Sequence, residues 1–158
     1  MLTASGRPVR DKSTKGALMT LDEIAKLLPN PACSDTLGWR LMDADIERGW
    51  IKVGFEGRPE FLNPAGRVQG GFLAAMLDDT MGPVVMVKSE GTLYPSSIDM
   101  NISFLAAAKP GPLVCEAEVL RLGKTVGFVE GRLMDAEGRL LARATSSVML
   151  VPAERLPS

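Results

Sequence analysis

The residues most able to do chemistry lie in one stretch, residues 63–87. At its centre two adjacent carboxylates, Asp78 and Asp79, interrupt a long run of apolar, helix-forming residues. A carboxylate in apolar surroundings acquires a perturbed pKa, which suits it to act as a general base or as a nucleophile. We expect Asp78 to have this role and Asp79 to reach solvent. If the helix instead kinked or ended near Gly82-Pro83, both aspartates would reach solvent.

A second chemical feature precedes the carboxylates, where a loop rich in Asn, Pro and Gly meets the apolar run. This change predicts a helix that begins at Gln69-Gly70-Gly71. The first backbone amides of a helix are unpaired donors at the positive end of its dipole. The Gly70 amide is therefore suited to hold a carbonyl oxygen that becomes negative during acyl transfer. A Gly pair also serves close helix packing, so it is the combination with Asp78 that favours chemistry.

The spacing of these two features predicts an assembly. Asp78 lies eight residues beyond Gly70, which is about 12 Å along a helix axis. One helix cannot place both groups around the same carbonyl carbon. If both act in one reaction, a second subunit must supply one of them, so we expect a homodimer with active sites across its interface. This spacing does not decide between a homodimer and a homotetramer built from two such dimers.

The 158 residues include no histidine. Its absence excludes Ser-His-Asp and Cys-His catalysis and removes the usual ligand of catalytic zinc. We therefore expect no metal and no organic cofactor. Cys33 and Cys115 lack CxxC spacing, and we expect both to be buried thiols in a reducing compartment, which favours a cytoplasmic location.

Length and composition favour one globular domain, because 46% of the residues are hydrophobic and the chain is short for two domains. The net charge of −1 and a pI near 5.5 do not suggest a nucleic-acid-binding surface. We also expect no membrane span and no signal peptide, since no uninterrupted apolar stretch is long enough to span a bilayer and the N-terminus lacks the apolar centre of a signal peptide.

The elements that position the chemistry begin after a polar segment. We expect residues 1–19 to be a mobile arm and residues 20–158 to be the single domain. Thr20 and Glu23 fit a capping box that opens a short helix, which Pro29 and Pro31 would end. Alternating apolar residues then predict a β-hairpin over residues 37–55.

After the long helix the sequence predicts a meander of antiparallel strands over residues 97–104, 113–122, 125–134 and 140–151. In the first of these, Ser97 falls on the polar side and Ile98 on the apolar side. A sheet with one apolar face would wrap and bury the helix, which is an α+β arrangement. Its open edges and the remaining apolar surface would be covered by dimerisation.

The loop and the helix carry the pattern Asn63-x-x-Gly66-x-x-Gln69-Gly70-Gly71, followed by an apolar run that ends in Asp78. Downstream lie the segment 97–102 and the turn Gly123-Lys124-Thr125. In these positions the chain resembles the PaaI-type hotdog-fold acyl-CoA thioesterases, over about two-thirds of its length. It departs from the family at Gln69, where the family usually has His.

The resemblance implies a hotdog fold, an antiparallel sheet wrapped around a long central helix. It also implies roles for single residues: Asp78 as the essential carboxylate, Asn63 as a group that positions the carbonyl or the attacking water, and Ser97 as a hydroxyl that orients the nucleophile. The residues alone allow simpler roles. Asn63 before Pro64 suits a turn, and Ser97 suits an ordinary sheet hydroxyl.

Three further residues are candidates for substrate binding: Gln69, Gly71 and Lys124. A neutral amide cannot transfer a proton, so we expect Gln69 to supply hydrogen bonds that orient the loop. Lys124 could meet phosphates of a nucleotide tail, although a solvated turn lysine is the simpler interpretation.

We therefore expect an acyl-CoA thioesterase that hydrolyses an acyl- or aryl-CoA thioester to free acid and CoA. In it, the Gly70 amide polarises the carbonyl and Asp78 of the partner subunit acts as base or nucleophile. The alternative is a non-catalytic acyl-CoA-binding or sensing protein, in which Gln69 marks lost chemistry. Dehydration of hydroxyacyl thioesters is a weaker third reading, because such sites rely on His.

Overall fold

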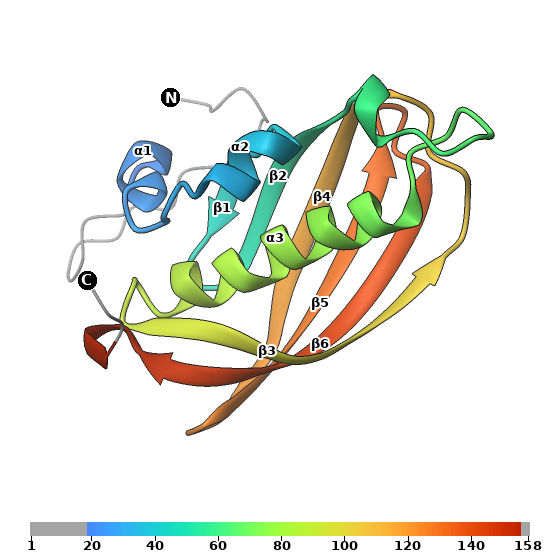
Figure 1. Cartoon of the computed structure of the whole chain (residues 1–158). Coiled ribbons are helices and arrows are strands. Elements are labelled where there is room, and N and C mark those ends of the chain that lie inside the picture. The colour runs from blue at the N-terminus through green and yellow to red at the C-terminus, as the bar shows by residue number, and fades with distance from the viewer. Residues whose placement is uncertain (1–18, 156–158) are drawn as a thin grey trace.

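A six-stranded antiparallel sheet curls around one long helix, α3 (Gly70–Lys88), in the computed structural model of the chain (Figure 1). The structure describes residues 19–155. The predicted arm therefore lies outside the described residues, apart from Met19. The strand order is β1-β2-β4-β5-β6-β3. This arrangement confirms the predicted α+β hotdog fold.

The sheet consists of β1 (Arg40–Asp45), β2 (Trp50–Gly57), β3 (Leu93–Phe104), β4 (Gly111–Leu122), β5 (Val126–Asp135) and β6 (Leu140–Pro152). Short helices complete the fold: α1 (Leu21–Ala25), α2 (Ala32–Leu37) and two 3-10 turns, Pro59–Phe61 and Ala153–Arg155. The four strands predicted after the helix are confirmed to within a few residues, because turn residues mark their ends clearly. Their prediction as one meander was wrong for the first of them, since β3 pairs with β6 at the edge of the sheet and not with β4.

The helix α3 is the centre of the core. Its buried side chains include Met76, Leu77 and Met81, which have 1% exposure or less. Gly131 of β5 lets the helix approach closely, since a Cβ there would lie 3.0 Å from Met81 Cγ. By length and hydropathy α3 could cross a membrane, contrary to our expectation from the sequence, but half of it is buried within the fold. Its apolar composition is that of a core helix.

The helix does not end at Gly82-Pro83 and continues to Lys88. Pro83 has no N–H to donate to the carbonyl of Asp79, four residues earlier. The indole Nε1–H of Trp39 donates to that carbonyl oxygen instead, at 2.8 Å. A side chain from the N-terminal part of the chain thus replaces the missing helical hydrogen bond.

The N-terminal part differs from the prediction at one element. The capping box of Thr20 and Glu23 is present at α1. However, residues 32–37 form α2, so the prediction that Leu37 lies in a strand was wrong. Pro31 is the N-cap of this helix rather than a stop, and Gly38 ends it in the left-handed conformation at φ 72°. The hairpin therefore begins at Arg40.

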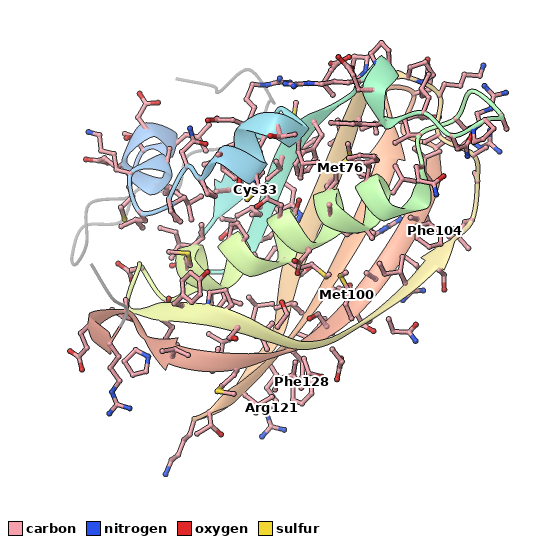
Figure 2. All side chains as sticks on the ribbon, viewed as in Figure 1. Cys33, Met76, Met100, Phe104, Arg121 and Phe128 are labelled. Carbon is pink, nitrogen blue, oxygen red and sulfur yellow. The ribbon has the colours of Figure 1, made fainter. Side chains whose placement is uncertain are left out.

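The strand β3 forms one edge of the sheet and pairs only with β6 among the described strands. Its register shifts between Ser97 and Asp99, where one extra residue is inserted. This bulge overturns the predicted two-face alternation at Ser97 and Ile98, whereas the predicted apolar positions Met100 and Ile102 pack against the core. Ser97 faces α3, whereas the predicted apolar position Ile98 is 54% exposed. Met100 is on the same side of the strand as Ser97 and lies between β3 and α3 (Figure 2).

The two cysteines lie in different surroundings. Cys115, on β4, is fully buried, and this burial raises the pKa of its thiol to about 12. Cys33, on α2, is exposed. The prediction of two buried thiols is therefore correct for Cys115 and wrong for Cys33.

Candidate active site

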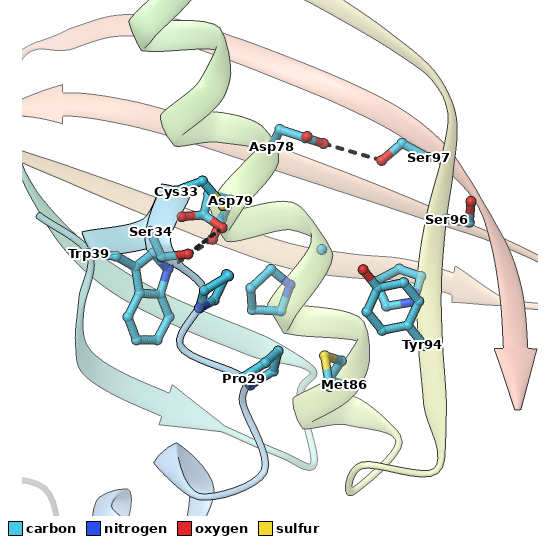
Figure 3. A pocket seen from close by; sticks show the side chains of 14 residues that line it. Pro29, Cys33, Ser34, Trp39, Asp78, Asp79, Met86, Tyr94, Ser96 and Ser97 are labelled. Carbon is cyan, nitrogen blue, oxygen red and sulfur yellow. Dashed lines mark hydrogen bonds between the residues drawn. The ribbon is translucent and has the colours of Figure 1, made fainter. Parts of the chain in front are cut away.

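Asp78 lies in the middle of α3 with its side chain exposed toward β3. Its Oδ1 accepts a hydrogen bond from Ser97 Oγ at 3.2 Å (Figure 3). The bulge in β3 makes this contact possible, because it turns Ser97 toward the helix. The structure thus brings together two of the predicted site residues, a carboxylate and a hydroxyl that fixes its orientation.

These two residues line a cavity of about 330 Å³. Its walls come from three parts of the chain: the segment 29–39, the middle of α3, and residues 94–97 of β3 (Figure 3). Four prolines, Trp39 and Tyr94 give these walls flat, stiff surfaces. The volume is at the lower end for small-molecule sites.

Asp79 lies in the same cavity, in surroundings that the sequence did not predict. Its Oδ1 accepts a hydrogen bond from Ser34 Oγ at 3.0 Å, and its Oδ2 is buried without a hydrogen-bond partner among residues 19–155. Burial raises the pKa of Asp79, the Ser34 hydrogen bond opposes this, and the neighbouring Asp78 adds to it. Asp79, which we expected to reach solvent, is therefore the more buried carboxylate of the pair, and Asp78 is the exposed one.

The N-terminus of α3 is held by the loop before it. The rings of Phe61 and Phe72 stack at 4.1 Å, and Gln69 N donates to Phe61 O at 2.8 Å. Asn63 has the turn role that the residues alone allowed, since its Oδ1 accepts from the backbone amides of Ala65 and Arg67 at 3.0 and 3.2 Å. No hydrogen bond from the Asn63 amide nitrogen is found to any described residue, so these NH₂ donors are available.

A second, more open cavity of about 520 Å³ lies at this helix end and is lined by Asn63, Gly70 and Phe104 among others. The ring of Phe104 lies against Gly70, where a Cβ would be 3.4 Å from Phe104 Cζ. Phe104 lies at the end of β3 beside the start of α3 (Figure 2). This ring is a site feature that sequence reasoning missed.

The predicted site residues therefore fall into two groups within one chain. Asp78 and Ser97 line one cavity, and Asn63 and Gly70 line the other. Gln69 is the exposed N-cap of α3, without a side-chain capping bond. Gly71 is also exposed. Lys124, in the β4–β5 turn, lines neither cavity.

Ser34, Trp39 and Asp79 were also missed as site residues. One signal was available, because a proline inside a helix leaves the carbonyl four residues earlier without its partner. That signal points to Asp79. It does not identify Trp39, which is 40 residues away in sequence.

The chemical groups of the site are carboxylates, hydroxyls, amides and a helix dipole. Among residues 19–155, no three His, Cys, Asp or Glu side chains gather in a way that could hold a metal ion. The carboxylate of Asp78 can accept a proton or attack a carbonyl carbon. The first amides of α3 can stabilise a developing oxyanion.

Known proteins share this fold and these segments. Residues 65–142 match the family model described as the thioesterase superfamily. A solved structure from Ralstonia eutropha JMP134, described as a thioesterase and phenylacetic acid degradation-related protein, is 37% identical with a TM-score of 0.74, over 80% of this chain and 95% of that one. The E. coli PaaI protein from the phenylacetic acid degradation operon, at 21% identity, shares the fold with a TM-score of 0.71, over 77% of this chain and 86% of that one.

A further relative is the Homo sapiens protein named acyl-coenzyme A thioesterase 13. It is 36% identical over 86 residues, which are 53% of this chain and 61% of the human protein. These likenesses confirm the resemblance predicted from the loop and helix pattern. The chain belongs to the thioesterase superfamily, as a PaaI-like, hotdog-fold thioester hydrolase.

Proposed function

We propose that the protein hydrolyses acyl-CoA thioesters to a free acid and coenzyme A, in active sites shared by two subunits of a homodimer. The name of the human relative supports coenzyme A as part of the substrate. The observation that carries the proposal is the separation, within one chain, of the acid from the helix N-terminus. Asp78 lines one cavity and Gly70 lines the other.

The edge strand β3 offers a way to join two subunits. Ser97, beside Asp78, and Phe104, beside Gly70, lie seven residues apart on this strand. Two β3 strands paired antiparallel about a two-fold axis between Met100 and Asn101 would place Ser97 of one subunit opposite Phe104 of the partner subunit. The acid of one chain would then approach the helix N-terminus of the other.

The same pairing would provide partners for the backbone groups of β3 and cover its exposed apolar side chains. An edge strand of 12 residues carries a row of unpaired backbone groups. Ile98 and Phe104, each 54% exposed, would be covered. A tetramer of two such dimers is a larger assembly that this pairing leaves open.

Hydrolysis would follow a base mechanism. Asp78 accepts a proton from water as the water oxygen bonds to the carbonyl carbon, and the carbonyl π electrons move onto oxygen. The Gly70 N–H and the dipole of α3 stabilise that negative oxygen. The C=O bond then re-forms, the C–S bond breaks, and the sulfur receives the proton from Asp78, which regenerates the carboxylate. In a nucleophilic variant Asp78 bonds to the carbonyl carbon and the C–S bond breaks, which releases the coenzyme thiolate. Water then cleaves the resulting anhydride to the free acid and the Asp78 carboxylate, and the remaining proton goes to the thiolate.

The other predicted residues would assist this step. Ser97 holds the carboxylate of Asp78 by its hydrogen bond. Asn63 uses Oδ1 in its own loop, so its amide NH₂ can hold the carbonyl or the water. Gln69 and Gly71 lie at the same helix end and would supply hydrogen bonds and room for the substrate. Lys124, in the β4–β5 turn, would meet phosphates of the coenzyme.

A panel of short, medium and aryl acyl-CoAs tests the activity, with Asp78→Asn as the matched variant. We expect turnover by the wild type and a loss of about 10²–10⁴-fold in kcat in Asp78→Asn, because the base is removed while the size of the side chain is kept. Unchanged turnover in this variant would remove Asp78 from the mechanism. Tight binding with no turnover by the wild type would favour the sensing protein.

Mixed dimers test the shared site. Gly70→Pro removes the amide N–H, and proline suits the first helical position that Gly70 occupies. We expect each of Gly70→Pro and Asp78→Asn to be inactive alone. After random exchange of subunits, half of the dimers are mixed and each has one intact site of two, so about a quarter of wild-type activity should return. No recovery in exchanged mixtures, or a monomer in solution, would contradict the shared site.

A further inference from the structure

The segment 29–39 forms one wall of the cavity beside Asp78 (Figure 3). Pro29, Pro31 and Trp39 present stiff apolar surfaces to the cavity. Leu37 anchors the end of this segment in the core, with 6% exposure. The position of the wall then depends on how the segment is fastened to α3.

Asp79 fastens it twice. Its carbonyl oxygen, which Pro83 leaves without a helical donor, accepts from Trp39 Nε1 at 2.8 Å. Its carboxylate accepts from Ser34 Oγ at 3.0 Å. We call Ser34, Trp39 and Asp79 the Asp79 clamp.

The clamp is specified by buried polar groups. Ser34 is 3% exposed, so leaving its hydroxyl without a hydrogen-bond partner would cost free energy, and Asp79 provides that partner. The backbone carbonyl of Asp79 also requires a donor, because an unpaired helical carbonyl away from water is unfavourable. All three residues of the clamp line the cavity, and Asp79 directly follows the proposed base Asp78.

We infer that the Asp79 clamp holds the segment 29–39 as a fixed wall of the acyl cavity and thereby limits the enzyme to compact acyl groups. In this role Trp39 determines specificity, and Ser34 and Asp79 are positioning residues. The inference rests on the proposed acyl-CoA hydrolysis. A cavity of about 330 Å³ suits a short or single-ring acyl group, whereas a longer chain needs the wall to move outward.

The test uses variants that remove the donors of the clamp. Trp39→Phe keeps a flat ring without the N–H, and Ser34→Ala removes the hydroxyl. Asp79→Asn is the conservative rescue, since its amide oxygen still accepts from Ser34 and its backbone carbonyl is unchanged. Thr36→Ala is the matched control on α2, because among the described residues the Thr36 hydroxyl bonds only within α2, to Ala32 O at 2.9 Å.

The readout is the ratio of kcat/KM for butyryl-CoA to that for dodecanoyl-CoA. We expect the wild type to favour the short substrate, and the Ser34→Ala/Trp39→Phe double variant to lower this ratio at least tenfold, through KM. Asp79→Asn and Thr36→Ala should keep the ratio within threefold of wild type. An unchanged ratio in the double variant, or an equal fall in kcat for both substrates, would overturn the inference.

Two further measurements keep the test decisive. Hydrogen exchange should be faster in the amides of residues 29–39 of the double variant and unchanged in Thr36→Ala; no loosening would overturn the clamp. Pro83→Ala restores a helical donor to the Asp79 carbonyl, which then depends less on Trp39, and it favours folding of α3. We expect it to lower the kcat/KM ratio, by a smaller factor than the double variant, and it serves as the test if the double variant does not fold. An unchanged ratio in folded Pro83→Ala would count against the clamp.

Failure of the proposed function is distinguishable from failure of the clamp. If the wild type hydrolyses no acyl-CoA, the proposed function fails. The clamp is then tested by the ratio of the Kd for dodecanoyl-CoA to the Kd for butyryl-CoA, measured by calorimetry on the same variants. We expect that ratio to fall in the double variant and to persist in Asp79→Asn, and the reverse result would overturn the inference.

Discussion

Ser97 Oγ donates to Asp78 Oδ1 at 3.2 Å and so connects the edge strand of the sheet to the middle of the central helix. The contact exists because the bulge after Ser97 turns this side chain toward α3. It holds the carboxylate at the mouth of a cavity that the edge strand itself helps to form. A strand that can pair with a second subunit is thus coupled directly to the proposed base.

We expect Ser97→Ala to lower kcat about tenfold with a small change in KM, because the carboxylate of Asp78 loses the group that orients it. The fold should be unaffected, since Ser97 is exposed. Steady-state kinetics on the best acyl-CoA will measure this. Ser103→Ala on the same strand, opposite the exposed Arg143, is the control and should have wild-type kinetics. Equal losses in both variants would contradict an orienting role.

Asp79→Asn should stabilise the protein at neutral pH, by about 1 kcal/mol. Burial raises the pKa of Asp79 above its ordinary value of 3.8, so the folded state binds the proton more tightly than the unfolded chain. Stability therefore falls as pH rises from 3.8 through the folded pKa, and the full penalty is present above it. Asparagine carries no charge and removes that penalty.

Urea unfolding at several pH values will measure this difference. The advantage of Asp79→Asn should shrink as pH falls through the folded pKa and vanish below 3.8, where both states of the wild type are protonated. Asp78 is present in both proteins, so the comparison isolates residue 79. An advantage that grew in acid would contradict the assignment.

Two glycines should respond in opposite directions to alanine. In Gly131→Ala the new Cβ would lie 3.0 Å from Met81 Cγ and 3.1 Å from Leu77 Cδ2, so we expect a loss of about 1–3 kcal/mol of stability from overpacking. In Gly71→Ala nothing lies within 4 Å, and alanine favours helix, so we expect a gain of about 0.5 kcal/mol. Urea midpoints will rank the two. A loss in Gly71→Ala would show that this position is more crowded than the single chain suggests.

One thiol per chain should react with a disulfide reagent in the native protein. Cys33 is exposed, whereas Cys115 is buried and its pKa is raised to about 12, which leaves almost no thiolate. Titration with a chromogenic disulfide should give one equivalent in buffer and two in denaturant. Cys33→Ser should abolish the native reaction. Fast reaction of both thiols without denaturant would contradict the burial of Cys115.

Much of the fold could be predicted from the sequence because the evidence for it is local. The apolar run from Gly70 specifies a buried helix, turn residues separate the last strands, and the capping box of Thr20 starts α1. The spacing from Gly70 to Asp78 already implied that one chain cannot unite them. Each of these features depends on residues that are close in sequence.

The tertiary structure decided what depends on distant partners. The sequence could not determine which of Asp78 and Asp79 is buried, because this follows from Ser34, 45 residues before Asp79. It could not show that a bulge turns Ser97 inward, because a one-residue shift in register is set by the pairing with β6. Likewise, the sequence could not show that Trp39 donates to the Asp79 carbonyl, which Pro83 leaves without a helical donor. Hydrogen-bond partners this far apart in sequence are brought together by tertiary packing, which no local sequence pattern specifies.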